Sequence, residues 1–207
     1  MSYRGKRALD VAVAAPALLV TAPLQLATAA VIRLLMGRPI IFCQRRAGIH
    51  GHPFTLIKFR TMRNSEGAVD PRTDAQRLTA LGKVLRATSL DELPTLWNVL
   101  RGDMSLVGPR PLLLEYVPRY SAHEARRLEV RPGVTGLSQV NGRNELPWSD
   151  RFLMDVRYVD GASLKWDLKI LVLTLWKVFR RDGISSSGHV TMPVFHGSSS
   201  ERKYPPG

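Results

Sequence analysis

The feature that most constrains the fold is a nearly continuous apolar run from Val11 to Leu35, which follows a basic start and opens at Asp10. About 20 apolar residues are enough to cross the hydrocarbon core of a bilayer as a helix. Two prolines, Pro16 and Pro23, lie inside the run. The sequence therefore predicts a membrane helix at the N-terminus, in one of three forms.

A cleaved secretory signal fits the basic start and the small triplet at 27–29, but an acidic residue at the opening of the run argues against it. A spanning helix fits the length, yet both flanks are basic, and cytoplasmic loops carry such an excess. Both ends are therefore expected in the cytoplasm. The remaining form, over residues 1–37, is a re-entrant helix that enters one leaflet, bends near a proline and returns.

The stretch from Ser89 to Pro111 holds adjacent carboxylates, Asp91 and Glu92. With Ser89 as the helix cap, Ser89-x-x-Glu92 is a capping box, and the acids only satisfy free amides. Pro94 would then lie inside the helix, at a cost of up to about 3 kcal/mol. With Asp91 as the cap, Pro94 falls in the first turn, where no N–H is needed. Asp91 would then lie at the positive end of a helix, which favours an ionised carboxylate and a bound phosphate.

The stretch ends in Gly108-Pro109-Arg110-Pro111, a rigid turn with one guanidinium. A planar fork fixed between two prolines suits phosphate oxygens. From these four residues alone, a solvent-exposed turn arginine is an equal alternative.

The charge balance indicates an anionic partner. The chain has 30 Lys and Arg against 17 Asp and Glu, a net charge of +13. Nucleic acid, anionic lipid and a phosphorylated substrate all fit such a surplus. The basic residues do not form one block, and no zinc-finger or RNP pattern is visible, so no nucleic-acid partner is expected. The single cysteine, Cys43, excludes an intrachain disulfide framework.

Taken in order, these motifs resemble those of the bacterial sugar transferase family, the monotopic phosphoglycosyl transferases, and most closely its small members that carry only the catalytic domain. The resemblance covers nearly the whole chain. It implies transfer of a phosphosugar from a UDP-sugar, one that is N-acetylated, to polyprenol phosphate, giving UMP. It also implies Mg²⁺ and a monotopic protein on membrane lipids at the cytoplasmic face of the bacterial inner membrane. The motifs are Lys58–Met62, Ser89–Leu93, Asn98–Pro111, Arg131–Gly136 and Gln139–Arg143.

The resemblance also implies roles for individual residues. Asp91 is expected to be the catalytic nucleophile, with Glu92 as a second catalytic residue and both as Mg²⁺ ligands. Expected substrate contacts are Lys58, Arg60, Arg110, Pro111, Arg131, Gln139, Arg143 and His189. Direct attack by lipid phosphate in a ternary complex, and a non-catalytic basic membrane-surface protein, remain alternatives. Whether the chain forms a homo-oligomer stays open.

Three residues are expected to act structurally. Family members often have Ser-Pro at the break of the re-entrant helix, where this chain has Ala22-Pro23. We expect Thr21 to satisfy the freed backbone there, and Pro23→Ala to straighten the helix towards a spanning form. The resemblance also indicates an ion pair between Arg86 and Asp167.

The remaining sequence predicts an α+β, mostly helical catalytic domain over residues 38–197 and a disordered tail over 198–207. Two β-prone runs, 39–44 and 54–59, predict a hairpin, whose turn histidines lack a third metal ligand. Apolar periodicity predicts amphipathic helices at 74–87, 112–130 with a break at Pro118, 148–159 and 163–181. The last has a wide apolar face, two tryptophans and five basic residues. It is therefore expected to lie in the headgroup plane of a membrane.

Overall fold

The structure is a computed structural model that describes residues 3–63, 74–142, 146–180 and 194–197. The predicted substrate contacts Arg143 and His189, and the predicted tail over 198–207, lie outside the described residues.

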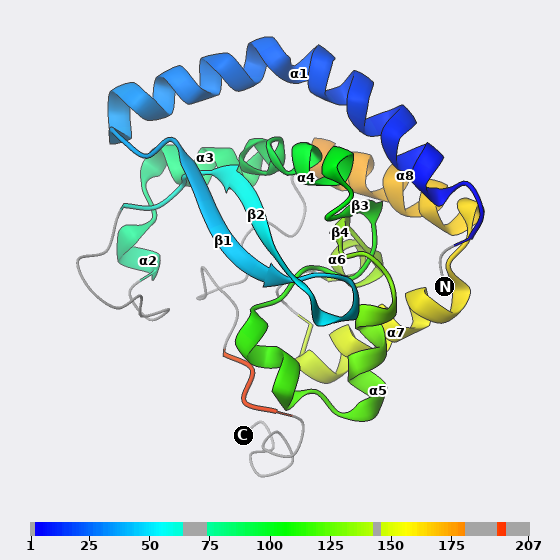
Figure 1. Cartoon of the computed structure of the whole chain (residues 1–207). Helices are drawn as coiled ribbons and strands as arrows, with labels where there is room; N and C mark the ends of the chain where they lie inside the picture. Colours follow the sequence, from blue (N-terminus) through cyan, green and yellow to red (C-terminus); the bar gives the residue numbers. More distant parts are fainter. Residues whose placement is uncertain (1–2, 64–73, 143–145, 181–193, 198–207) are drawn as a thin grey trace.

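Helix α1, Lys6–Met36, is one continuous helix that arches over the rest of the chain (Figure 1). Pro16 and Pro23 lie inside it, so the predicted break at Ala22-Pro23 is wrong and a curved helix takes its place. The Thr21 hydroxyl donates to the Ala17 carbonyl at 2.6 Å, and not to the carbonyl that Pro23 leaves without its usual partner. Within the described residues, α1 alone is long and apolar enough to cross a membrane.

The N-terminal end of α1 is fixed to the domain by buried polar side chains. Asp10 is 2 % exposed and accepts hydrogen bonds from the Ser105 hydroxyl at 2.8 Å and from the Leu106 amide at 2.9 Å. Arg7 donates to the Leu100 carbonyl at 2.7 Å. A buried carboxylate is stable only with such partners, so this end of α1 belongs to the packed domain.

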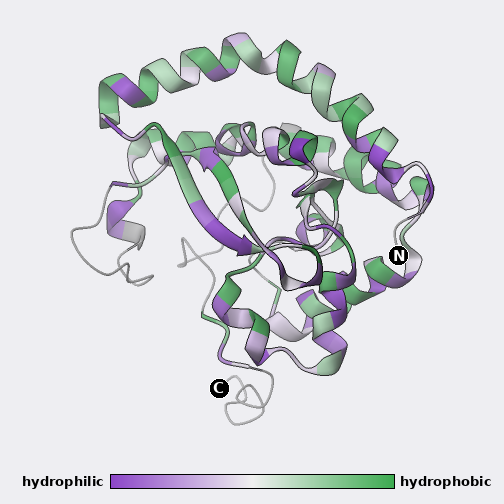
Figure 2. Cartoon of the chain, in the orientation of Figure 1, coloured by the Kyte–Doolittle hydropathy of each residue, from purple (hydrophilic) through white to green (hydrophobic). Residues whose placement is uncertain are grey.

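The C-terminal end of α1 is also packed, whereas its middle is exposed. Ile32 lies in a buried cluster with Phe59 and Leu85. Between the two ends, Leu19 and Val20 are 77 % and 79 % exposed. Figure 2 shows hydrophobic residues along the whole arch. An apolar helix with a solvent-facing middle is typical of a membrane-embedded segment.

The predicted hairpin is confirmed. Strand β1, Ile41–Ala47, pairs antiparallel with β2, Pro53–Phe59, through a short 3-10 turn, η1, Ile49–Gly51. His50 and His52 are exposed in the connection. In the described part of the chain, no group of three or more His, Cys, Asp or Glu side chains is arranged to hold a metal ion.

The α+β, mostly helical fold is confirmed, with changes in how the helices divide. The expected helix over 74–87 is split, because Thr79 leaves the helix and accepts a hydrogen bond from the Gly82 amide at 2.9 Å as a new N-cap. The expected helix over 112–130 consists of short pieces. From residue 74 to 129 the helices are α2, Asp74–Arg77; α3, Ala80–Ala87; η3, Leu90–Glu92; α4, Thr95–Arg101; η4, Leu114–Arg119; α5, Ala122–Ala125; and η5, Arg126–Glu129.

The two long helices of the C-terminal half match the prediction closely. Helix α6, Leu137–Val140, precedes the two predicted long helices, α7, Trp148–Gly161, and α8, Leu164–Arg180. A second small sheet pairs β3, Ser105–Val107, in parallel with β4, Gly133–Thr135.

Helix α8 buries one face and exposes an apolar one. Asp167 and Ile170 are at most 2 % exposed. On the other side, a row of apolar side chains is 47–65 % exposed: Leu164, Leu168, Val172, Leu175 and Trp176. This exposed row is what a helix in the headgroup plane requires.

Candidate active site

The acidic pair lies on the short turn η3, directly before α4. Ser89 adopts a left-handed conformation, with φ 56°, and forms no side-chain cap. Helix α4 begins at Thr95 with Pro94 as its N-cap, so the proline stands where no backbone N–H is needed. Neither predicted helix start is therefore correct. Asp91 lies in the turn that precedes the helix, not at the helix N-terminus.

The two carboxylates have different surroundings. Glu92 forms ion pairs with Lys58, from the end of β2, and with Arg110, at 3.3 Å. Asp91 is 8 % exposed, and its carboxylate accepts no hydrogen bond from any described residue. The structure therefore brings together four of the predicted residues, with one carboxylate held by cations and the other left available.

Burial, together with the neighbouring charge of Glu92, raises the pKa of Asp91 to about 6. The positive charges of Lys58, Arg86 and Arg110 act in the opposite direction and lower this pKa. Burial also lowers the pKa of Lys58, although its ion pair with Glu92 opposes the shift. Because a pKa of about 6 lies below neutral pH, Asp91 is mostly ionised at pH 7, as a nucleophile must be.

Two buried polar residues of α4 fix the acidic pair relative to β2. The Thr95 hydroxyl donates to the Ile57 carbonyl at 3.0 Å, and the Ile57 amide donates to the Asn98 side chain at 3.1 Å. Asn98 is fully buried and also donates to the Thr55 carbonyl at 2.8 Å. These bonds set the register in which Lys58, the residue after Ile57, meets Glu92. Roles for Thr95 and Asn98 were not predicted from the sequence, although polar residues on the buried face of an amphipathic helix are a recognisable signal.

The Gly-Pro-Arg-Pro turn packs directly on the loop over 131–136. The Gly108 amide donates to the Thr135 carbonyl and the Gly133 amide to the Pro109 carbonyl, both at 2.9 Å. A Cβ atom on Gly108 would lie 2.4 Å from the Arg131 carbonyl oxygen, so only glycine allows this approach. Two motifs about 25 residues apart thus form one rigid support for Arg110.

Further arginines surround Arg110, and the sequence analysis missed them. Arg127 forms a buried ion pair with Asp155 at 2.7 Å and donates to the Arg110 carbonyl at 2.7 Å. Burial, together with the charge of Arg110, lowers the pKa values of Arg46 and Arg151 to about 10. Burial disfavours the charged form of a guanidinium, and the like charge of Arg110 adds to this effect, so an anion bound on this side of the site would be favourable.

Two predicted substrate contacts form structural bonds in the fold. Arg60 donates to the carbonyls of residues 36–38, at the C-terminal end of α1. Arg131 donates to the Gly102 carbonyl at 2.8 Å, at the end of α4. Helix C-termini carry unpaired carbonyls and partial negative charge. Both guanidiniums stabilise such ends, and their contact with substrate stays a prediction.

Two other predicted substrate contacts are Pro111, in the Gly-Pro-Arg-Pro turn itself, and Gln139. Pro111 is buried, and its carbonyl lies 3.5 Å from a guanidinium nitrogen of Arg46. Gln139 donates to the Val134 carbonyl at 2.9 Å, while its side-chain oxygen is buried with no partner among the described residues. An orphaned buried acceptor of this kind is suited to a donor group of a substrate.

The predicted ion pair between Arg86 and Asp167 is wrong. Asp167 is fully buried, pairs with Lys6 at 2.5 Å and accepts a hydrogen bond from the Tyr158 hydroxyl at 2.7 Å. Arg86 donates to the Thr61 hydroxyl at 3.1 Å. The arched helix α1 brings its own lysine to Asp167, which a sequence separation of 161 residues does not reveal.

Comparison with known proteins identifies the family. A family model described as bacterial sugar transferase matches residues 1–181. The chain belongs to the bacterial sugar transferase family. It is therefore an enzyme of the transferase class, and the alternative of a non-catalytic membrane-surface protein is not supported.

Individual relatives agree with this assignment. The chain is 52 % identical to the uncharacterized sugar transferase EpsL of Bacillus subtilis, over 93 % of this chain and 96 % of the relative. It is 43 % identical to the UDP-glucose:undecaprenyl-phosphate glucose-1-phosphate transferase of Caulobacter vibrioides, over 86 % of this chain and 70 % of the relative. The undecaprenyl-phosphate galactose phosphotransferase of Salmonella typhimurium is 42 % identical over 71 % of this chain, which spans 35 % of that longer protein.

Proposed function

We propose that this enzyme transfers a phosphosugar from a UDP-sugar to polyprenol phosphate, giving a polyprenyl diphosphate sugar and UMP. The names of the Caulobacter and Salmonella relatives describe transfer of a sugar phosphate to undecaprenyl phosphate. The observation that carries the proposal is the buried carboxylate of Asp91, which accepts no hydrogen bond from a described residue and lies among Glu92, Lys58, Arg86 and Arg110. Cations around a carboxylate offset its repulsion of a diphosphate.

In the first step, an oxygen of Asp91 attacks the sugar-side phosphorus of the donor. A bond forms between this oxygen and phosphorus, the bond from phosphorus to the bridging oxygen breaks, and UMP leaves with that oxygen. The surplus positive charge around Arg110 stabilises the charge that develops on the phosphate oxygens.

In the second step, a phosphate oxygen of polyprenol phosphate attacks the same phosphorus. The acyl phosphate bond breaks, the Asp91 carboxylate is restored, and the product leaves as a diphosphate. One site serves both substrates in turn, which removes the need to hold two large anions together.

Mg²⁺ fits the residues of the pair. It is commonly bound by one or two carboxylates together with substrate phosphates, and Asp91 and Glu92 supply two carboxylates. The raised pKa of Asp91, caused by burial and by Glu92, marks a place where added positive charge is favourable. When bound, Mg²⁺ supplies charge that offsets the repulsion between the acidic pair and the diphosphate.

The arch of α1 supports a monotopic placement on the cytoplasmic side of the membrane. Both ends of the helix bond to the same domain, while its apolar middle is exposed. A helix whose two ends lay on opposite sides of a bilayer would have one end separated from that domain. A lipid phosphate cannot leave the bilayer cheaply, at about 0.8 kcal/mol for each exposed CH₂ group. We therefore expect the reaction at the headgroup plane, and a monotopic α1 supports a site at that level.

The test is mass spectrometry of the detergent-solubilised protein with Mg²⁺ and a panel of UDP-sugars, without lipid acceptor. The panel holds UDP-glucose, UDP-galactose and their N-acetylated counterparts. We expect a mass gain of one phosphosugar with one donor, lost in Asp91→Asn and kept in Asp150→Asn, which changes an exposed carboxylate on α7.

Two other outcomes would contradict parts of the proposal. UMP release only after polyprenol phosphate is added, with no adduct at any time, would indicate direct attack in a ternary complex. An absence of both adduct and UMP with every donor would contradict the proposed reaction.

A further inference from the structure

A cavity of about 440 Å³ lies where the end of α1 meets the start of α3. Its lining combines cationic and apolar side chains, and it shares no residue with the acidic pair or with the cations that contact it. The lining residues are Leu35, Met36, Arg38, Arg60, Arg63, Thr79, Ala80 and Leu81. A cavity lined by both cationic and apolar side chains suits a ligand with an anionic head and an apolar tail.

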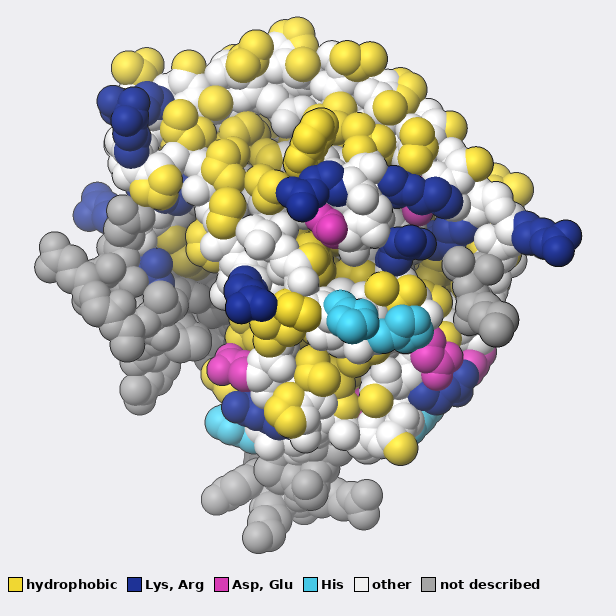
Figure 3. All heavy atoms as spheres, in the orientation of Figure 1, with side chains coloured by type: hydrophobic (Ala, Val, Ile, Leu, Met, Phe, Trp, Pro, Cys, Tyr) yellow, Lys and Arg dark blue, Asp and Glu magenta, His cyan; other side chains and the backbone are white. Residues whose placement is uncertain are grey.

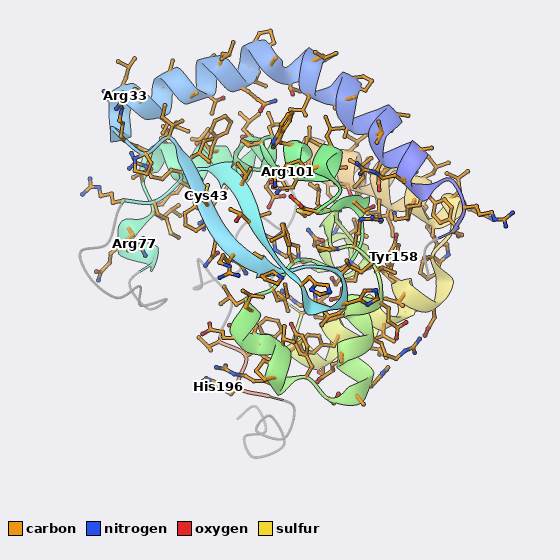
Figure 4. All side chains as sticks on the ribbon, viewed as in Figure 1. Arg33, Cys43, Arg77, Arg101, Tyr158 and His196 are labelled. Atoms are coloured by element: carbon orange, nitrogen blue, oxygen red, sulfur yellow. The ribbon has the colours of Figure 1, made fainter. Side chains whose placement is uncertain are left out.

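Two of the cations at this cavity have no acidic partner among the described residues. Arg38 and Arg63 are exposed, and neither forms an ion pair with a described residue. Within the described part of the chain, the stretches 33–63 and 76–90 contain no Asp or Glu, and the acidic residues beside them in sequence are Asp74 on α2 and the pair Asp91 and Glu92. Figure 3 shows Lys and Arg side chains at the edge where α1 ends, and Figure 4 places Arg33 and Arg77 at that same edge.

The cavity also opens beside apolar surface. Leu34 and Leu35, in the last turns of α1, are 82 % and 71 % exposed, and Val84 on α3 is 57 % exposed. Arginines beside such surface extend their guanidiniums to the headgroup level while their stems remain in apolar surroundings. A bilayer that surrounds the arch of α1 would therefore place its phosphate layer at this hollow.

We propose that this cavity binds the phosphate head of an anionic glycerophospholipid, with its acyl chains along the exposed end of α1. Arg38 and Arg63 provide the charge for the phosphate, and Leu35 and Leu81 provide the apolar wall. Arg60 already stabilises the end of α1, so lipid binding and helix position are coupled through one side chain. The inference does not depend on the proposed transfer reaction, because neither Asp91 nor Glu92 lines the cavity.

The test is native mass spectrometry of the full chain in detergent, titrated with phosphatidylglycerol against phosphatidylcholine. We expect one retained phosphatidylglycerol, and in the double variant Arg38→Gln/Arg63→Gln an apparent Kd raised about tenfold or more. A matched control, Arg33→Gln/Lys83→Gln, removes the same charge from exposed positions on α1 and α3 outside the cavity. We expect less than about a threefold change in that control, because a built site depends on position.

A second variant tests the cavity without changing charge. Ala80→Leu adds volume at an exposed lining position and should weaken phosphatidylglycerol retention while the thermal melting temperature is kept. Equal losses in the double variant and in its control would overturn the proposal in favour of diffuse attraction. Equal retention of phosphatidylcholine, or retention of polyprenol phosphate but not phosphatidylglycerol, would also overturn it.

Discussion

At the scale of single residues, the position of Asp91 lowers the stability of the folded chain. Asp91 is buried beside a second carboxylate, and both features disfavour its charged form. Lys58, Arg86 and Arg110 act in the opposite direction and lower the pKa of this residue, so that the carboxylate is mostly ionised at pH 7, as the proposed role of nucleophile requires. The three cations compensate the charge of Asp91 only in part, so this charge lowers the free energy of unfolding by a measurable amount.

We predict that Asp91→Asn raises the free energy of unfolding at pH 7.5, by up to about 3 kcal/mol, while abolishing turnover. The pKa of Asp91 is about 6 in the folded chain against an ordinary value of 3.8, so above pH 6 the folded state carries a charge that it disfavours. As the pH falls below 6, the folded wild type takes up a proton, and this disadvantage shrinks until it is lost below 3.8. The difference in melting temperature between variant and wild type should therefore be positive at pH 7.5 and shrink towards pH 5.

The measurement is thermal unfolding in detergent without Mg²⁺ or nucleotide. Asp150→Asn, which changes an exposed carboxylate, serves as the control and should show no such pH-dependent gap. The raised pKa of Asp91 would be contradicted if Asp91→Asn melted below the wild type, or if the difference in melting temperature grew as the pH fell.

At the scale of elements, the site depends on how α4 is held against β2. Thr95 and Asn98 bond the backbone around Ile57, and Lys58 follows directly. A shift of α4 along the strand would separate Lys58 from Glu92 without altering either residue. Positioning of the pair is therefore a property of the contact between these two elements.

We predict that Asn98→Ala lowers the free energy of unfolding by about 2–4 kcal/mol, because it leaves a buried amide and a buried carbonyl of β2 without partners. Arg101→Ala, on the same helix with a side chain 58 % exposed, should change it by less than about 0.5 kcal/mol. Thermal and chemical unfolding of both variants measure the difference. Equal stability of the two variants would show that α4 is held by apolar packing alone.

The elements also show what a sequence reveals. Apolar periodicity predicted α7 and α8 within a few residues, and β-prone runs predicted the hairpin, because each signal is local. The structural bonds of Arg60 and Arg131 were not predicted, because their partners are carbonyls at the ends of helices 22 or more residues away. Motif resemblance marks a residue as important, but cannot tell a helix cap from a substrate contact.

At the scale of the whole molecule, α1 decides how the enzyme meets the membrane. Its N-terminal end brings Lys6 to Asp167 and Asp10 to β3, and its C-terminal end packs on Phe59. Both ends of the helix are therefore fixed to the same domain, which opposes a spanning arrangement. The sequence predicted a re-entrant form with a break at Pro23, whereas the proposed monotopic placement rests on these buried contacts.

The final prediction tests this difference with Pro23→Ala. The sequence alone predicts that the variant straightens α1 towards a spanning form. Removing an interior proline favours a straight helix by about 3 kcal/mol. A spanning form would have to strip Lys6 from Asp167 and remove the partners of Asp10, and breaking a buried pair costs about 3–5 kcal/mol. Because the contacts outweigh the proline, we expect Pro23→Ala to keep both ends of α1 on one side.

The native Cys43, exposed on β1 just after α1 (Figure 4), reports the C-terminal end of the helix. Arg4→Cys in a Cys43→Ser background reports the N-terminal end, since Arg4 is exposed. A membrane-impermeant maleimide should label both cysteines in inside-out vesicles and neither in intact cells, with or without Pro23→Ala. If Pro23→Ala changes the labelling of Arg4→Cys alone, so that this cysteine reacts in intact cells, then Pro23 and not the buried packing keeps both ends of α1 on one side. If the two cysteines are labelled from opposite sides of the membrane even without Pro23→Ala, α1 spans the membrane and the monotopic proposal fails.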